Sequence, residues 1–232
     1  MVCVAVLHRT GSAISRQLVA GPDRRLSATA ITGRLRRHIA NVAVVSTKHP
    51  LENKYGIALY SNLVVTTCRV LGMVKDAIPS IDALVRLRNS QSVRVFAVHA
   101  NPPRPGESTV KRDAELILVG REVADDESAI VLGDMNDVGW SRTTDLFQEV
   151  SKLLDPREGC GFFSTFDATS WIMRYPLDYL FHSDDFRVVE LKTLEFIGSD
   201  HFSLLIELSH EPTAEPKQDA PDSDAGDKAD AE

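Results

Sequence analysis

The alternation of apolar and polar residues predicts a series of β-strands from residue 55 onward. Residues 80–88 and 91–99 both alternate with a period of two, and Asn89 and Ser90 between them suit a hairpin turn. Two stretches have the period of a helix, one running from a possible N-cap at Ser108 to about residue 124 and one over 143–154. The other expected strands cover residues 55–61, 129–132, 177–181, 187–194 and 202–208. Strands interspersed with helices in this way indicate an α/β fold.

The strand over residues 129–132 is entirely apolar, which predicts burial on both faces of a sheet. It is followed by Gly133, and then by Asp134 and Asn136. Polar groups just beyond strand ends are where open α/β sheets bind ligands. Gly-Asp and Asn-Asp pairs are also common in ordinary turns, so this stretch alone leaves both interpretations open.

Further polar residues stand at the ends of other expected strands. His99 ends one strand, Asp178 begins another, and Asp200 and His201 directly precede the last one. Each has an ordinary alternative, as a hydrogen-bonded rim histidine, a strand cap or part of a turn. Two histidines and three carboxylates, counting Asp134, all placed at such boundaries indicate a functional site.

The formal net charge of −7 is distributed unevenly along the 232 residues. Residues 1–50 carry +7, residues 51–210 carry −8 and residues 211–232 carry −6. The acidic tail, 211–232, has no aromatic or aliphatic cluster, and we expect it to be disordered. We expect residues 49–210 to form the folded domain. Its acidic balance is a poor electrostatic match for a polyanion.

Residues 1–48 differ in composition from the rest, with seven arginines and one lysine among their charges. Short strands over 2–7 and 42–45 and a weak helix over 26–39 are the elements that the pattern predicts there. Two interpretations are open for this segment: a poorly ordered leader, or a basic arm that binds nucleic acid.

The three cysteines, Cys3, Cys68 and Cys160, are too few and too far apart for a disulfide framework or a zinc motif. They favour a reducing compartment, and we expect a cytoplasmic location. No apolar run approaches the roughly 20 residues of a membrane-spanning helix, so no membrane segment is expected.

Five short motifs resemble, in order and spacing, those of the endonuclease/exonuclease/phosphatase superfamily, which has the DNase I-like fold. Residues 133–136 (GDMN) resemble its GDxN motif, and residues 199–201 (SDH) resemble its terminal motif. The other three are residues 55–61 (YGIALYS), 98–103 (VHANPP) and 174–179 (RYPLDY), similar to elements of this superfamily or of a bacterial subgroup. The resemblance implies an α/β sandwich of two packed mixed β-sheets flanked by helices, incomplete at its N-terminus.

The resemblance also implies a Mg²⁺-dependent phosphoesterase and a role for each residue at the strand ends. Asp134 would orient or deprotonate the attacking water, and Asn136 would donate a hydrogen bond to a phosphoryl oxygen. His99 would protonate or stabilise the leaving oxygen. His201, held by Asp178, would contact the phosphate or transfer a proton.

Asp200 and Asp134 are the implied metal ligands, and their oxygens suit Mg²⁺, with Mn²⁺ as a substitute. The superfamily also supplies an Asn after its first strand and a metal-binding Glu after the next. Asp23 and Glu52 are the only acidic residues before Tyr55, and neither is correctly placed. Residues 1–48 are therefore either a shifted reading frame or misassigned start, or the sign of a diverged member with a weakened metal site. Both explanations predict low activity.

The substrate class stays open between nucleic acid, a lipid phosphodiester and a small phosphate ester, and the acidic charge favours a small ester. Four aromatic residues near the motifs could stack on a base, line a lipid-facing cleft or pack in the core: Trp140, Phe162, Phe163 and Trp171. The rival functions are a non-catalytic remnant that binds a phosphorylated ligand or partner, and a nucleic-acid-binding protein that uses the Arg-rich segment.

Overall fold

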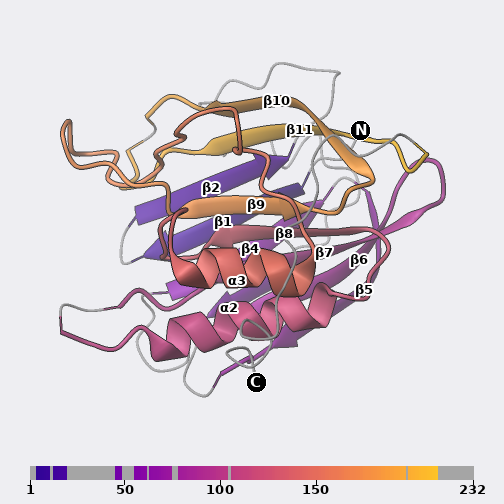
Figure 1. Cartoon of the computed structure of the whole chain (residues 1–232), viewed down its shortest axis with the longest axis horizontal. Coiled ribbons are helices and arrows are strands. Elements are labelled where there is room, and N and C mark those ends of the chain that lie inside the picture. The colour runs from indigo at the N-terminus through magenta and orange to yellow at the C-terminus, as the bar shows by residue number, and fades with distance from the viewer. Residues whose placement is uncertain are drawn as a thin grey trace.

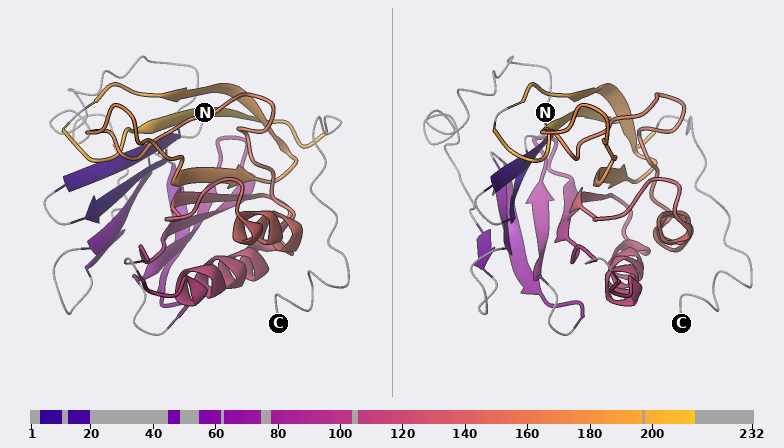
Figure 2. Two further views of the ribbon diagram at one scale, coloured as in Figure 1. Left: turned by 60° about the vertical axis from the view of Figure 1, so that its left-hand side comes forward. Right: turned by 90° about the vertical axis from the view of Figure 1, so that its left-hand side faces the viewer.

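Two β-sheets pack face to face, and two helices cover the outer face of one of them (Figures 1 and 2). The computed structural model describes residues 4–10, 13–19, 45–48, 55–61, 63–74, 78–103, 106–196 and 198–213. None of the helices in these ranges is long and apolar enough to cross a membrane.

The sheet next to the helices has five strands, in the order β5-β6-β7-β8-β9. All neighbours are antiparallel except β7 and β8, which run parallel and are joined through the helix α2. The strands are β5 (Val64–Leu71), β6 (Ser80–Arg86), β7 (Ser92–His99), β8 (Ala129–Asp134) and β9 (Asp178–His182). The parallel pair places the ends of β7 and β8 at the same edge of the sheet.

The second sheet has six strands, in the order β10-β11-β2-β1-β4-β3. Only β11 and β2 run parallel. The strands are β1 (Val4–Thr10), β2 (Ala13–Val19), β3 (Val45–Lys48), β4 (Tyr55–Ser61), β10 (Phe186–Thr193) and β11 (Leu204–His210). Three strands of this sheet, β1, β2 and β3, lie within residues 1–48, and the other three lie after that segment. The helix expected over 26–39 and residues 214–232 of the expected disordered tail lie outside the described residues.

The space between the sheets is filled by the inward-facing residues of both. Ile57 and Leu59 of β4 and Ile206 of β11 meet Val95 of β7 and Ile130 of β8, and each of these side chains is at most 2% exposed. Because side chains alternate along a strand, the intervening residues of the five-stranded sheet face the opposite way, toward the helices.

The helices α2 (Val110–Val123) and α3 (Arg142–Ser151) close that opposite face. Leu116 of α2 and Phe147 of α3 belong to one buried cluster with Phe96, Val131 and Phe181 of the sheet. All six residues of β8 are buried, as the apolar run predicted for a strand covered on both sides.

The structure and the solved folds described below confirm the predicted α/β sandwich flanked by helices. Within the described residues after Tyr55, the expected strands and both helices are present with ends shifted by a few residues. The strand β5 was missed, because its sequence VVTTCRVL has no clear apolar face. Most of its residues are exposed, and it pairs only with β6.

Candidate active site

Three of the residues singled out in the sequence lie in a single row across neighbouring strands. The register pairs His99 of β7 with Asp134 of β8, and Asp134 with Asp178 of β9. Residues directly opposite each other project from the same face of a sheet, and neighbouring strands are about 4.8 Å apart. All three residues are at most 2% exposed. The fold therefore concentrates one imidazole and two carboxylates at one buried edge.

Gly133 makes this row possible. Its φ is +150°, and a Cβ at this position would lie 1.8 Å from the carbonyl oxygen of Val98. Because β7 and β8 approach so closely at this pair, a side chain cannot be accommodated. The glycine of the GDMN motif thus sets the contact between the strands immediately before His99 and Asp134.

His201 reaches the row from the segment that precedes β11 in the other sheet. Its Nδ1 donates a hydrogen bond to Oδ2 of Asp178 at 2.6 Å, and its Nε2 lies 3.8 Å from Oδ2 of Asp134. Nε2 of His99 lies 3.9 Å from the same Asp134 oxygen. Both imidazoles therefore lie within 4 Å of the same carboxylate oxygen.

Local contacts fix the position of His201. Its backbone N–H donates to Oγ of Ser199 at 3.2 Å, which explains the serine in the SDH motif. The ring of Phe166 lies 4.9 Å from the imidazole, centroid to centroid. Thr165, beside it, accepts a hydrogen bond from the backbone N–H of Asp178 at 3.2 Å.

The charges in this buried site shift the pKa values of its members. Burial raises the pKa of Asp134, the negative charge of Asp178 raises it further, and the positive charge of His201 opposes both. Burial disfavours the charged form of His201, but the carboxylates of Asp178 and Asp134 outweigh it and raise the pKa of His201 to about 9. His201 is therefore a cation at neutral pH, suited to contact an anionic phosphoryl group.

Asn136 holds the loop after β8 against the end of β7. Its Nδ2 donates to the carbonyl oxygen of Ala100 at 2.8 Å, and its backbone N–H donates to Oδ1 of Asp134 at 3.0 Å. Its φ of 48° is left-handed, a conformation that asparagine adopts more readily than most residues. The role in phosphate binding expected for Asn136 stays a prediction.

Two contributors to the site were not singled out from the sequence. Arg112 of α2 donates from Nη1 to the carbonyl oxygen of Asn136 at 2.8 Å and lies 3.2 Å from Asp137. Phe166 covers His201 as described above. An arginine on an amphipathic helix and a phenylalanine in an irregular segment carry no local signal that would distinguish them from surface and core residues.

The carboxylates of Asp134 and Asp200 could supply some, but not all, of the ligands that a hard cation such as Mg²⁺ needs. Asp200 accepts a hydrogen bond from its neighbour Ser199 at 3.3 Å, and its charge raises the pKa of Asp134. Oxygen donors of this kind fit Mg²⁺, which is usually bound by one or two carboxylates together with waters and substrate phosphates. Among the residues that the structure describes, no three His, Cys, Asp or Glu side chains are arranged to hold a metal ion. The described part of the chain therefore offers a partial ligand set, without the Glu of the superfamily.

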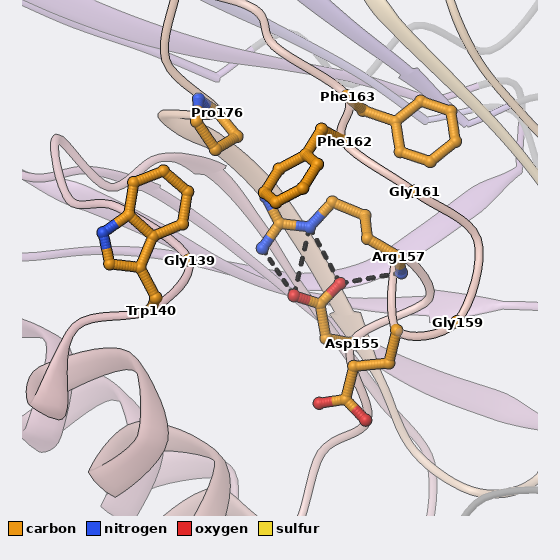
Figure 3. Close-up of a pocket in the computed structure, with 10 residues that line it drawn as sticks. Gly139, Trp140, Asp155, Arg157, Gly159, Gly161, Phe162, Phe163 and Pro176 are labelled. Carbon is orange, nitrogen blue, oxygen red and sulfur yellow. Dashed lines mark hydrogen bonds and ion pairs between the residues drawn. The ribbon is translucent and has the colours of Figure 1, made fainter.

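The four aromatic residues noted in the sequence occupy different environments. Phe163 is half-buried and packs against the core between the sheets. Trp171 is 90% exposed. Trp140 and Phe162 line a cavity of about 290 Å³ and are largely exposed (Figure 3).

Solved structures with this fold share little sequence with the chain. An endonuclease/exonuclease/phosphatase from Beutenbergia cavernae aligns with a TM-score of 0.65 at 18% identity, covering 90% of this chain and 62% of that one. The catalytic domain of human nocturnin, solved with a bound sulfate anion, aligns with a TM-score of 0.61 at 16% identity, covering 79% and 77%. A mannosyl-6-phosphatase from Bacteroides thetaiotaomicron aligns with a TM-score of 0.55 at 19% identity, covering 73% and 78%. None of the curated protein sequences matches the chain.

The sequence itself matches the profile of one family over residues 12–201, a range that contains every residue of the row and the SDH motif. This match covers most of the chain, and it agrees with the two-sheet fold and with the motifs that form the site. The chain belongs to the Endonuclease/Exonuclease/phosphatase family.

Proposed function

We propose that this protein is a metal-dependent phosphoesterase that hydrolyses a phosphodiester or phosphomonoester. The observation that carries the proposal is the buried row His99, Asp134 and Asp178, with His201 hydrogen-bonded to Asp178. Membership of the family supports phosphoester hydrolysis in general. The net charge of −7 favours a small ester over a long polyanion.

In this proposal, Asp134 orients the attacking water and accepts its proton. A buried carboxylate with a raised pKa is a better base than an exposed one, because the pKa lies closer to neutral pH. The cation of His201, fixed by Asp178, stabilises charge on the phosphoryl oxygens. His99, whose Nε2 lies 3.9 Å from the Asp134 carboxylate, protonates the leaving oxygen.

Mg²⁺ or Mn²⁺ would be held by Asp134 and Asp200, completed by waters and substrate oxygens. When bound, such an ion neutralises phosphoryl charge and polarises the bond that is broken. Asn136 contributes by holding the loop that follows Asp134 against the end of β7.

Hydrolysis of bis-(p-nitrophenyl) phosphate with Mg²⁺ or Mn²⁺ tests the proposal. We expect metal-dependent turnover that falls by roughly 10²–10⁴-fold in Asp134→Asn and in His201→Gln, the range for loss of a positioned acid or base. His210→Gln is the matched control. His210 forms a comparable pair with Asp185, with Nε2 to Oδ2 at 2.8 Å, outside the site.

Equal losses in His201→Gln and His210→Gln would mean that destabilisation, and not chemistry, explains the effect. A folded protein without turnover in either metal would overturn the hydrolase proposal. It would favour a non-catalytic protein that binds phosphorylated ligands, which inorganic phosphate binding by calorimetry would then detect.

A further inference from the structure

Asn136 is held from two directions, although it lies in the loop that follows β8. Its side-chain Nδ2 donates to the carbonyl oxygen of Ala100 at 2.8 Å, and its own carbonyl oxygen accepts from Nη1 of Arg112 at 2.8 Å. A carboxamide nitrogen carries two N–H bonds, so the bond to Ala100 fixes the direction of the second N–H. The contacts that hold Ala100 and Arg112 therefore decide where Asn136 can donate.

Arg112 is a buried cation in the first turn of α2. Its Nε donates to Oδ1 of Asp113 at 2.8 Å, and its Nη2 lies 3.2 Å from Oδ1 of Asp137. A guanidinium that is bound by two carboxylates has little freedom to turn. The hydrogen bond from Arg112 to the carbonyl of Asn136 therefore ties the main chain of this loop firmly to the helix.

Glu115 lies three residues after Arg112, on the same face of α2, and is fully buried. Burial raises the pKa of its carboxyl to about 8, and a hydrogen bond from the backbone of Asn101 acts in the opposite direction. The carboxyl is therefore mainly protonated at pH 7, and its carbonyl oxygen is the acceptor for Asn101. Through this contact the helix also reaches the loop that follows β7.

The peptide group between Ala100 and Asn101 connects Glu115 with Asn136. Its N–H is the donor to Glu115, and its carbonyl oxygen is the acceptor for Nδ2 of Asn136. Because a peptide group is planar and rigid, fixing its N–H also fixes its carbonyl. Residues 102 and 103 are prolines without an N–H, so Asn101 is the last backbone donor of this stretch.

We propose that Arg112 and Glu115 are positioning residues that hold Asn136 in the orientation in which it donates to a phosphoryl oxygen. Arg112 acts on the main chain of Asn136, and Glu115 acts on its side chain through the peptide group after Ala100. This inference rests on the proposed phosphoesterase function for its effect on turnover. The hold of Glu115 on Asn101 can be measured without turnover.

Substitution of Glu115 gives the direct test. Glutamine keeps a carbonyl oxygen for Asn101, whereas leucine fills a similar volume without an acceptor. With bis-(p-nitrophenyl) phosphate and Mg²⁺, we expect Glu115→Leu to lower kcat/KM by roughly 10–100-fold and Glu115→Gln to retain the wild-type value. Gln148→Leu, which replaces a buried polar residue of α3, is the matched control and should keep the wild-type value. Wild-type kcat/KM in Glu115→Leu, or an equal loss in Glu115→Gln, would overturn the proposal.

A double-mutant cycle distinguishes positioning of Asn136 from a general loss of structure. Because Glu115 acts through Asn136, we expect Glu115→Leu to cost less than about twofold in kcat/KM once Asn136 is replaced by alanine. Arg112→Met should show the same dependence on Asn136, with Arg121→Met in the last turn of α2 as its control. Losses that multiply in the double variants would overturn the route through Asn136.

Hydrogen–deuterium exchange gives a readout that does not depend on turnover. We expect the amide of Asn101 to exchange roughly tenfold faster in Glu115→Leu than in wild type or Glu115→Gln, because leucine leaves it without its acceptor. Unchanged exchange in Glu115→Leu would overturn the hold of Glu115 on this loop. Faster exchange in a protein that hydrolyses no ester with Mg²⁺ or Mn²⁺ would overturn the phosphoesterase and support the hold on the loop.

Discussion

Gly133 shows how strongly a single residue constrains the site. We expect Gly133→Ala to lower the free energy of unfolding by roughly 3 kcal/mol or more, because a Cβ there would lie 1.8 Å from a backbone oxygen of β7 and the φ of +150° disfavours a side chain. Denaturant unfolding measures the loss. Gly72→Ala is the control, since a Cβ at Gly72 would have no atom within 4 Å. Similar losses in the two variants would contradict the role assigned to the close approach of β7 and β8.

Glu115 gives a prediction for the pH dependence of stability. It is fully buried on α2, and burial raises its pKa from 4.5 to about 8, while a hydrogen bond from the backbone of Asn101 acts in the opposite direction. Between these two values the folded chain keeps a proton that the unfolded chain releases. The free energy of unfolding therefore falls as the pH rises, by about 1.4 kcal/mol for each pH unit from this group alone.

Glu115→Gln should remove this loss, because glutamine has a similar shape and no charge to bury. We expect the variant to be more stable than wild type at pH 8 and closer to it at pH 5, as followed by thermal unfolding across that range. Glu122→Gln, on the exposed side of the same helix, is the control. A Glu115→Gln variant whose stability runs parallel to wild type at all pH values would refute the prediction.

At the scale of elements, the two helices begin in different ways. Ser141 caps α3, and its Oγ accepts a hydrogen bond from the backbone N–H of Thr144 at 3.0 Å. The N-cap of α2, Thr109, makes no such bond through its side chain. We expect Ser141→Ala to cost about 1 kcal/mol of stability and Thr109→Ala to cost much less, as measured by urea unfolding. A larger loss for Thr109→Ala would reverse the assignment.

The strands that were predicted from the sequence are those with one face or both faces buried in a core. Alternation identified residues 80–88 and 91–99, and the apolar run identified the strand over 129–132, because each contacts a core that selects its side chains. β5 was missed because hydrogen bonds to β6 hold it, with little burial to select a pattern. Alternation of apolar and polar residues arises from burial of one face of a strand. A strand that is held mainly by backbone hydrogen bonds has no such alternation, so the sequence does not reveal it.

The residues at the strand ends of the candidate site could be chosen from the sequence, but the residues that hold them in place could not. Residues at strand ends, such as His99, Asp134 and Asp178, could be chosen together because the ends of sheet strands gather at shared edges. The contacts of Arg112 with the Asn136 loop and of Phe166 with His201 depend on how distant segments pack. No pattern in the local sequence encodes such packing.

At the scale of the whole molecule, the core between the sheets joins them into one cooperative unit. We expect Ile206→Ala, which opens a cavity in this core, to lower the free energy of unfolding by about 2–5 kcal/mol. Leu205→Ala, on the half-buried side of the same strand, should cost less. Circular dichroism and tryptophan fluorescence should report coincident transitions in both variants. Separate transitions would show that the two sheets unfold independently.

The pairing of β11 with β2 has a consequence for the synthesis of the chain. Leu204–Ile206 lie beside Gln17–Val19, so β11 pairs with a strand that is synthesised 187 residues before it. At ribosomal rates of about 5–20 residues per second, the β1–β2 hairpin waits on the order of tens of seconds for the strand that covers the free edge of β2. During translation that edge is open to other unfolded chains, so the yield of folded protein in a cell should respond to the speed of elongation and to chaperones that shield nascent strands.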